Sequence, residues 1–123
     1  MKIAVDVMGT DYGPKELVLG AVNAVKEYAS EVIAMDEHPA IAVKSKKDAS
    51  IVVAAGLLRN KECDALVSSG STGAAVASAL FCVGRIRGVE RPAIATPIPS
   101  LKGTTVVLDS GAKVDAKPEH MVQ

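Results

Sequence analysis

Short apolar runs alternate along the chain with stretches in which apolar residues recur three and four positions apart. The runs predict strands and the longer spacing predicts helices. The predicted strands cover residues 2–7, 32–35, 64–68, 93–98 and 104–109. The predicted helices run from 14 to about 29, from near 39 to 59 with a break around 44–48, and from 72 to about 86. Because strands alternate with helices, we expect an α/β domain with a mostly parallel sheet and right-handed connections.

The pattern also predicts which elements are buried. The first strand, residues 2–7, is a continuous apolar run, which is typical of a central strand covered on both faces. The helix from residue 72 is apolar on most of its sides, so we expect it to be buried. Pro97 places the strand 93–98 at an end or an edge of the sheet. A last helix is expected to open near Pro118, with the proline at its first turn.

Composition narrows the protein class. Hydrophobic residues make up 49% of the 123 residues and aromatic residues only 2%, so Ala, Val, Ile and Leu must build the core. Fourteen basic residues balance fourteen acidic ones, and this neutral balance gives no basis for nucleic-acid binding. Cys63 and Cys82 form no CxxC pair, and we interpret them as reduced structural thiols. No apolar run is long enough to span a membrane, so a cytosolic soluble protein is expected.

A cluster of small polar residues follows the strand 64–68. Residues 68–73 read Ser-Ser-Gly-Ser-Thr-Gly and lead directly into the next helix. The first N–H groups of a helix lack intrahelical partners, and glycines let the backbone approach a ligand. The loop therefore fits a phosphate cradle, although a tight turn with a helix cap explains the same residues. It matches neither GxxxxGK[ST], GxGxxG nor GxSxG, and no neighbouring His could activate a serine.

Two further loops follow predicted strands and carry a similar set of residues. One contains Asp6, Gly9 and Asp11, and the other contains Asp109 and Gly111. If their strands are parallel to the strand 64–68, all three loops open at the same edge of the sheet. These carboxylates could bind a metal, but carboxylates at strand ends more often orient loops, and we predict no metal site.

Basic residues elsewhere carry a weaker signal. Lys44, Lys46 and Lys47 are interpreted as a solvated face, with an anion contact as the alternative.

Four segments together resemble PlsX-type phosphate acyltransferases. They are residues 6–21, 46–58, 64–103 and 106–123, and they cover nearly the whole chain in the order of that family. The matching positions in the family's motifs are Gly9, Asp11, Gly70, Thr72, Gly73, Asp109, Gly111, Lys117, Pro118 and His120. Ser69 and Ser71 stand where the family commonly has Ala and Asn. Compared with the family, the chain is short, lacks a βαβ unit expected between Tyr28 and Val32, and looks like an incomplete α/β domain.

The resemblance implies a fold and an activity. The fold would be a Rossmann-like three-layer sandwich similar to the isocitrate/isopropylmalate dehydrogenase and phosphotransacetylase group. The activity would be transfer of a fatty acyl group from acyl carrier protein to inorganic phosphate, giving acyl phosphate for phospholipid synthesis. No cofactor is implied, and the protein would be a cytoplasmic homodimer associated peripherally with the membrane through segments not present here. Two alternatives stay open: a small-acyl phosphotransacylase that uses coenzyme A, and a non-catalytic anion-binding domain.

Site residues follow from the same motifs. The expected phosphate and substrate contacts are Asp6, Gly9, Asp11, Ser69, Gly70, Ser71, Thr72, Gly73, Asp109, Gly111, Lys117 and His120. His120 could equally cap its own helix. The catalytic groups themselves are expected beyond Gln123.

Overall fold

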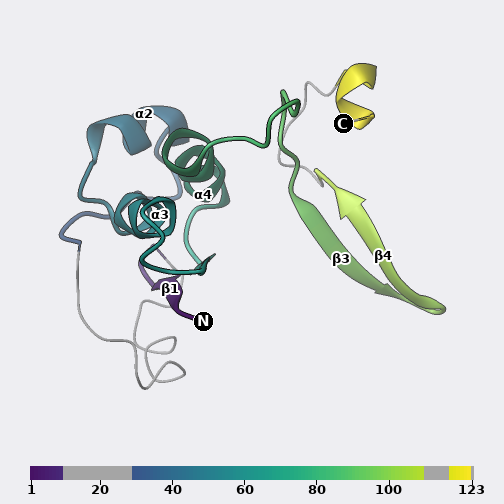
Figure 1. Ribbon diagram of the computed structural model, residues 1–123, viewed down its shortest axis with the longest axis horizontal. Helices are drawn as coiled ribbons and strands as arrows, with labels where there is room; N and C mark the ends of the chain where they lie inside the picture. Colours follow the sequence, from purple (N-terminus) through teal and green to yellow (C-terminus); the bar gives the residue numbers. More distant parts are fainter. Residues whose placement is uncertain (10–28, 110–116, 123) are drawn as a thin grey trace. The chain divides into compact units, whose positions relative to one another are not determined.

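A computed structural model describes residues 1–9, 29–109 and 117–122 of the chain. The chain divides into two compact units, Met1–Gly84 and Arg85–Gln123 (Figure 1). Most of the helix predicted from residue 14 lies outside the described residues. Among the described helices, none is long and apolar enough to cross a membrane.

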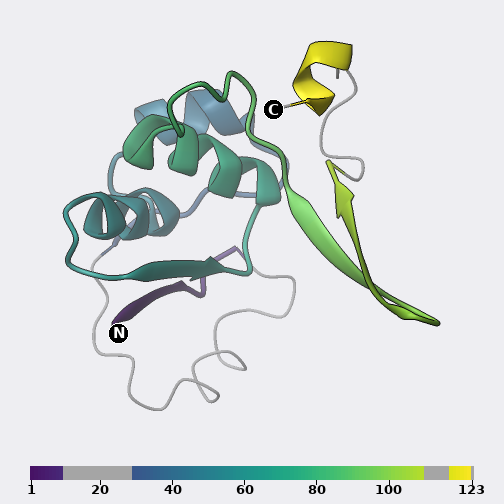
Figure 2. The ribbon, with the colours of Figure 1, turned by 45° about the vertical axis from the view of Figure 1, so that its right-hand side comes forward.

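The first unit is a small parallel sheet with helices on one side. Strand β1 (Ile3–Asp6) pairs in parallel with β2 (Ala65–Ser68), so that Asp6 lies opposite Ser68. The helices α2 (Pro39–Ser45), α3 (Ser50–Arg59) and α4 (Thr72–Ser78) form one layer over this sheet (Figure 2). Helix α3 packs against both strands, and α2 packs against α4. The parallel α/β arrangement and the break between α2 and α3 confirm the prediction from the sequence.

The core beneath these helices contains no aromatic side chain among the described residues. It is built from small and β-branched residues that are almost fully buried: Ile33, Ala42, Val43, Ala49, Ile51, Ala74 and Ala77. Val52, Leu66 and Ala75 pack against its edge. Such a core lets helices approach closely, and it agrees with the composition. Cys63 is buried, Cys82 is half-buried, and both are free thiols.

The prediction of a strand at residues 32–35 is wrong. Ile33 is buried as the pattern required, but among the described residues the segment forms no ladder with a neighbouring strand; the adjacent Glu31 forms an isolated parallel bridge with Ala49. The carbonyl of Val32 instead accepts a hydrogen bond from Lys46 Nζ at 2.8 Å. The segment is thus tied to the connection between α2 and α3, which a reading of apolar runs cannot reveal.

The helix after β2 ends earlier and is less buried than predicted. Helix α4 continues as a π-helical turn, η1 (Ala79–Val83), and stops at Gly84, where φ is +100°. A positive φ of this kind favours glycine and ends a helix. Phe81 is 49% exposed, so only one side of the helix faces the core. β1 likewise exposes Ile3 and Val5 by 47% and 41%, so the prediction of a strand buried on both faces is wrong for the described part of the chain.

The second unit contains an antiparallel hairpin. Strands β3 (Ala95–Ser100) and β4 (Gly103–Leu108) pair with Ser100 opposite Gly103, and Leu101 and Lys102 form the turn between them. The two strands form a sheet of their own among the described residues. The idea that β4 continues a parallel sheet with β1 and β2 is therefore not supported by any described pairing. The 3-10 turn η2 (Pro118–Met121) begins at Pro118, as expected.

Candidate functional site

The carboxyl ends of β1 and β2 are joined by a buried carboxylate. Asp6 is only 5% exposed, and its Oδ2 accepts a hydrogen bond of 2.7 Å from Ser68 Oγ on the neighbouring strand. Its Oδ1 accepts a hydrogen bond of 3.2 Å from the Met8 N–H, and its main-chain carbonyl accepts the Ser69 N–H at 3.4 Å. Asp6 therefore orients the loops at this edge of the sheet, because both of its carboxylate oxygens are occupied by protein donors.

The next links of this network lie in the glycine–serine turn, which we define as residues 68–73. The Gly70 N–H donates to Ser68 Oγ at 3.2 Å, so an N–H, a hydroxyl and a carboxylate follow one another in a chain that ends at Asp6. Ser71 is the N-cap of α4, and its buried Oγ accepts a hydrogen bond of 3.3 Å from the Ala74 N–H. The Ser68 and Ser71 hydroxyls thus serve the protein's own structure.

Other polar groups of the turn remain accessible. Ser69 and Thr72 are exposed, and neither hydroxyl has a hydrogen-bond partner among the described residues. The N–H groups of Thr72 and Gly73 stand at the start of α4, where a helix supplies no acceptor, and the described part of the chain supplies none either. These groups together offer two hydroxyls and two amides to a ligand.

The glycines of the turn are required for packing. A Cβ atom on Gly70 would lie 2.7 Å from the Met8 carbonyl oxygen, and one on Gly73 would lie 2.6 Å from Pro39 Cγ at the start of α2. Gly9, with a φ of +75°, lies next to Gly70 at the same edge. The glycines bring the β1 loop, the turn and α2 into close contact, which explains their spacing without a ligand.

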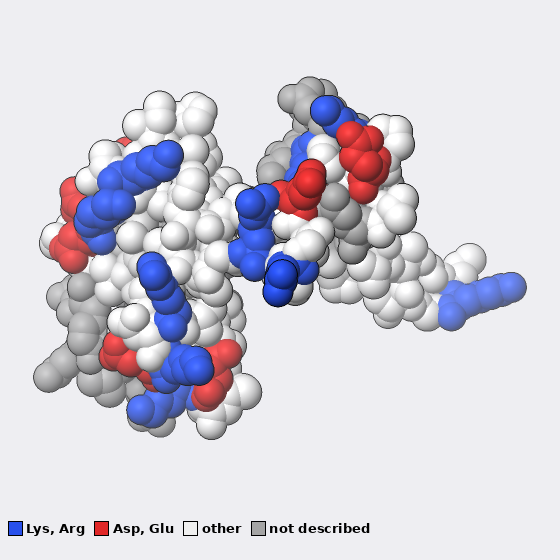
Figure 3. All heavy atoms as spheres, turned by 45° about the horizontal axis from the view of Figure 1, so that its top comes forward, with Lys and Arg blue, Asp and Glu red and all other residues white. Residues whose placement is uncertain are grey.

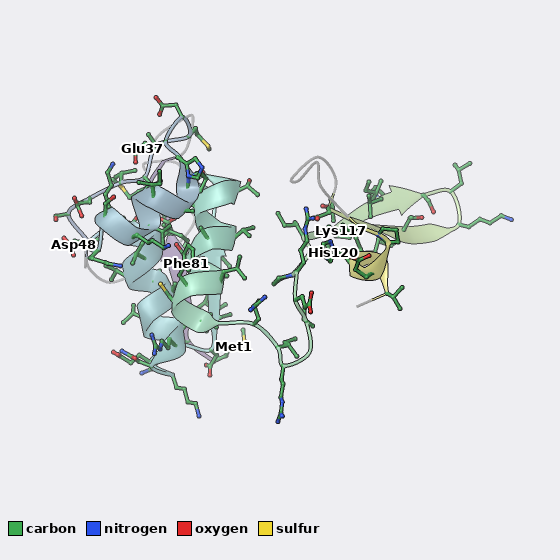
Figure 4. The ribbon with its side chains drawn as sticks, turned by 90° about the horizontal axis from the view of Figure 1, so that it is seen from above. Met1, Glu37, Asp48, Phe81, Lys117 and His120 are labelled. Atoms are coloured by element: carbon green, nitrogen blue, oxygen red, sulfur yellow. The ribbon has the colours of Figure 1, made fainter. Side chains whose placement is uncertain are left out.

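Three of the predicted site residues that the structure describes lie in the second unit. Asp109 has a φ of +56°, and its N–H donates to the Ile94 carbonyl at 2.8 Å, while its Oδ1 accepts the Ile94 N–H at 3.4 Å. Asp109 thereby closes the open end of the hairpin. His120 Nδ1 accepts the Lys117 N–H at 3.1 Å. Figure 4 labels both residues, which lie close together. His120 caps its own helical turn, as the alternative interpretation expected.

Sequence reasoning missed one member of this second group. Arg91 Nη1 lies 3.4 Å from His120 Nδ1. Nothing in the spacing of Arg91 along the sequence pointed to His120. The contact arises because the hairpin brings the segment before β3 back toward the segment after β4.

The structure therefore brings together part of the predicted site. Asp6, Gly9 and the glycine–serine turn share one edge of the parallel sheet, whereas Asp109, Lys117 and His120 belong to the other unit. Asp11 and Gly111 lie outside the described residues. Within the described ranges, no group of three or more His, Cys, Asp and Glu side chains is arranged to hold a metal ion.

The lysine cluster has structural contacts of its own. Lys46 forms a half-buried ion pair with Glu37 at 2.5 Å, and Lys44 Nζ lies 4.8 Å from the centre of the Phe81 ring. Basic and acidic side chains are interspersed over the face of the first unit that Figure 3 shows. These contacts favour the interpretation as a solvated face over the alternative of an anion contact.

The fold and the site define a class: an α/β protein with an orienting carboxylate and a small-residue turn at the carboxyl edge of a parallel sheet. Residues 28–123 match the family described as "Fatty acid synthesis protein", and the chain belongs to this family. Proteins named "Phosphate acyltransferase" match over the whole chain. They include those of Pelotomaculum thermopropionicum at 48% identity, Desulfitobacterium hafniense strain Y51 at 46% and Dictyoglomus turgidum at 45%. The resemblance found in the sequence motifs is thereby confirmed at the level of the family.

The lengths of these relatives differ from that of the chain. The chain spans about half of each: 45% of the Pelotomaculum protein and 46% of the other two. The match to the Pelotomaculum protein extends over 153 aligned positions, whereas the chain has 123 residues. The matched region of this relative is therefore longer than the chain.

Proposed function

We propose that the chain forms part of a phosphate acyltransferase, an enzyme that transfers a fatty acyl group to inorganic phosphate. The observation that carries this proposal is the match of the entire chain to relatives with that name, several of them at 42–48% identity. The orienting carboxylate and the accessible turn give it a physical basis. We further propose the Rossmann-like three-layer fold of the isocitrate/isopropylmalate dehydrogenase and phosphotransacetylase group.

The phosphate site of this proposal is the glycine–serine turn. The Ser69 and Thr72 hydroxyls and the Thr72 and Gly73 amides are donors of the turn that have no acceptor among the described residues, and a phosphate oxygen is an acceptor of the right kind. Gly70 and Ser71 would shape the turn. Asp6 and Gly9 would hold the neighbouring loop in place. The assignment of Asp109, Lys117, His120, Asp11 and Gly111 to the same site stays a prediction.

The proposed acyl donor is a thioester of acyl carrier protein. A phosphate oxygen attacks the thioester carbonyl carbon, a C–O bond forms, and the C–S bond breaks. The thiolate leaves with the electron pair of that bond, and the product is acyl phosphate. No covalent enzyme intermediate is needed, because phosphate is itself the nucleophile. Holding both reactants in line contributes roughly 7–11 kcal/mol in favourable cases. Donors at the oxyanion contribute about 3–4 kcal/mol more.

The proposal includes partners and a location. The resemblance supports a homodimer in the cytoplasm, associated peripherally with the membrane. It also supports entry of the product into phospholipid synthesis.

The test is an assay with defined substrates. The 123-residue protein and the full-length Pelotomaculum relative are each incubated with acyl-acyl carrier protein and phosphate, and acyl phosphate is trapped with hydroxylamine. We expect product from the relative. Product from acyl-coenzyme A in preference to acyl carrier protein would favour a small-acyl phosphotransacylase. Absence of turnover by the relative, with folding verified by circular dichroism, would reject the acyltransferase proposal.

A measurement of phosphate binding tests the proposed phosphate site independently of acyl transfer. Phosphate is titrated into the isotope-labelled 123-residue protein, and we expect shifts in the amide signals of Thr72 and Gly73. The double variant Ser69→Ala/Thr72→Ala should weaken phosphate binding about tenfold, as the loss of hydrogen bonds to a charged ligand predicts. The matched control is Ser50→Ala at the start of α3, which should leave binding unchanged. Phosphate binding without turnover by the relative would favour the non-catalytic anion-binding alternative. Absence of shifts at the turn would remove the phosphate site.

A further inference from the structure

The ring nitrogen Nδ1 of His120 faces two hydrogen-bond donors. The Lys117 N–H lies within hydrogen-bond distance at 3.1 Å, and Arg91 Nη1 lies at 3.4 Å. A main-chain N–H can only donate, and a guanidinium has no acceptor and keeps its protons in proteins. Both contacts are therefore hydrogen bonds only if Nδ1 carries a lone pair, because a proton on Nδ1 would face a donor in each of them.

These two contacts fix the position of the proton on the neutral ring. A neutral imidazole has one N–H and one nitrogen that accepts. Since Nδ1 is the acceptor, the proton lies on Nε2, and Nε2 is a donor. The ring is half-buried, and no described residue accepts a hydrogen bond from Nε2. His120 therefore offers one oriented N–H to a ligand, and Nε2 has no lone pair with which to act as a base.

The two donors come from different segments of the second unit. Lys117 precedes His120 by three residues, and its N–H makes a local contact within the turn η2. Arg91 precedes His120 by 29 residues, and it reaches the ring because the Asp109 N–H closes the hairpin on the Ile94 carbonyl at 2.8 Å. A cap of the turn needs only the local contact. The distant donor has the further effect of holding the ring in one tautomer and one orientation.

The charges around His120 favour an anionic acceptor. Arg91 brings a guanidinium to the ring, and the side chain of Lys117 is exposed on the same short turn (Figure 4). Glu119 is the single acidic residue between positions 117 and 122. Phosphate oxygens form strong hydrogen bonds with oriented N–H groups in a cationic setting.

We infer that His120 binds a phosphate group as a hydrogen-bond donor through Nε2, and that Arg91 is the residue that positions it. The identity of the ligand rests on the proposed function, whereas the tautomer rests on the contacts at Nδ1 alone. The inference assigns the donating atom and the orienting residue to a contact that the sequence motif only named. It also excludes Nε2 of His120 as a base. The proposed transfer needs no such base, since an ionised phosphate oxygen already has the lone pair that attacks.

Nitrogen NMR of the histidine rings tests the tautomer. In the isotope-labelled 123-residue chain at neutral pH, we expect His120 to be protonated on Nε2 and not on Nδ1; the variant His38→Gln identifies its signals. Arg91→Met should give a mixture of both tautomers. The matched control Arg87→Met changes an exposed arginine of the same unit and should leave the ring unchanged. Exchange protection of the Asp109 amide verifies that the hairpin is folded. A proton on Nδ1 in the unmodified chain, or an unchanged ring in Arg91→Met, would overturn the inference.

A substitution that keeps the cap and removes the donor tests the binding role. His120→Asn retains an acceptor for the Lys117 N–H and loses Nε2. It should keep the thermal stability of the chain, but weaken phosphate binding, followed through the amide signals of residues 119–122, by about tenfold. His120→Ala loses both groups and should lower stability as well. Equal phosphate affinity of the unmodified chain and of His120→Asn would overturn the inference.

Failure of this inference and failure of the proposed function give different results. Amide shifts at Thr72 and Gly73 report the phosphate site of the glycine–serine turn, whereas the Nε2 signal of His120 reports the contact inferred here. Phosphate shifts at the turn without any change at His120 would overturn the inference and leave the proposed function standing. A phosphate-dependent shift of Nε2, with no acyl transfer by the full-length relative, would support the inference and reject the acyltransferase.

Discussion

The glycine–serine turn and the β3–β4 hairpin lie in different units and differ in how far their surroundings support them. The turn stands on a packed core, and its glycines, its cap and Asp6 are all engaged by neighbouring protein groups. The hairpin exposes most of its side chains and leaves one edge without a partner among the described residues. A rigid turn can present a few free donors to a ligand, whereas an open edge gains stability by binding more protein.

The largest effect is expected from glycine substitutions in the turn. Gly70→Ala should lower the free energy of unfolding of the first unit by about 1–3 kcal/mol, because the new Cβ would meet a rigid main-chain oxygen. Urea denaturation followed by circular dichroism measures this. Gly56 in α3 is the matched control, since a Cβ there meets nothing within 4 Å, and Gly56→Ala should stabilise by roughly 0.5–1 kcal/mol. Equal effects of the two variants would refute the packing role of Gly70.

A comparable substitution in the hairpin should act locally. Gly103 has a φ of +132° and open space around it, so only main-chain strain opposes a side chain. Gly103→Ala should cost about 1–2 kcal/mol and appear as faster amide exchange in β3 and β4. The first unit should keep its exchange rates. The control Lys102→Ala in the same turn should leave the hairpin unchanged. If Gly103→Ala made the whole chain unfold more slowly than the unmodified protein, the expectation of a local destabilisation would be contradicted.

Substitution of either of two serines in the turn should have a smaller effect on stability, and the two effects should differ. Ser71→Ala removes the N-cap of α4 and should lower stability by about 1 kcal/mol. Ser69→Ala removes an exposed hydroxyl with no described partner and should change stability by less than about 0.5 kcal/mol. Thermal denaturation of both variants makes the comparison. If Ser69→Ala proves the more destabilising, the assignment of the cap is wrong.

The smallest expected effect is the loss, at acid pH, of the stability that the Asp48 carboxylate provides. Hydrogen bonds from the Ser30 hydroxyl and the Ser30 N–H hold the pKa of the Asp48 carboxyl below its ordinary value of 3.8. The stability that this carboxylate provides is therefore present above pH 3.8 and is lost as the pH falls below it through the folded-state pKa. Unfolding of the chain and of Asp48→Asn should be compared between pH 2 and pH 6. The difference between them should shrink at the acid end; a constant difference would show that protonation is not involved.

Much of the first unit could be predicted because local patterns and tertiary packing agree there. The apolar runs located β1 and β2, Pro39 marked the start of α2, and the Ser71–Thr72 boundary marked α4. The prediction and the structure disagree where a single residue ends a helix, or where a residue distant in the sequence supplies the hydrogen bond that holds a segment. Gly84 ended the helix before Ile86, and Lys46 held the segment 32–35 in place of a strand ladder.

The candidate site likewise has features that the sequence predicted and features that only the structure shows. The sequence correctly located a turn with small residues at a strand-to-helix junction, because that pattern is local. It could not tell that Gly70 and Gly73 serve contacts with Met8 and Pro39, since those contacts join segments far apart in the chain. Nor could it show that Asp109 closes a hairpin or that Arg91 meets His120.

The sequence by itself determined most of the strands and helices that the structure describes, the small aliphatic residues of the described core, and the family. The tertiary structure decided the pairing direction of each strand and the roles of the polar groups: which hydroxyls support the fold and which are free for a ligand. The reason is physical. Apolar periodicity records which side of an element is buried, but the choice of hydrogen-bond partner depends on groups that only folding brings together.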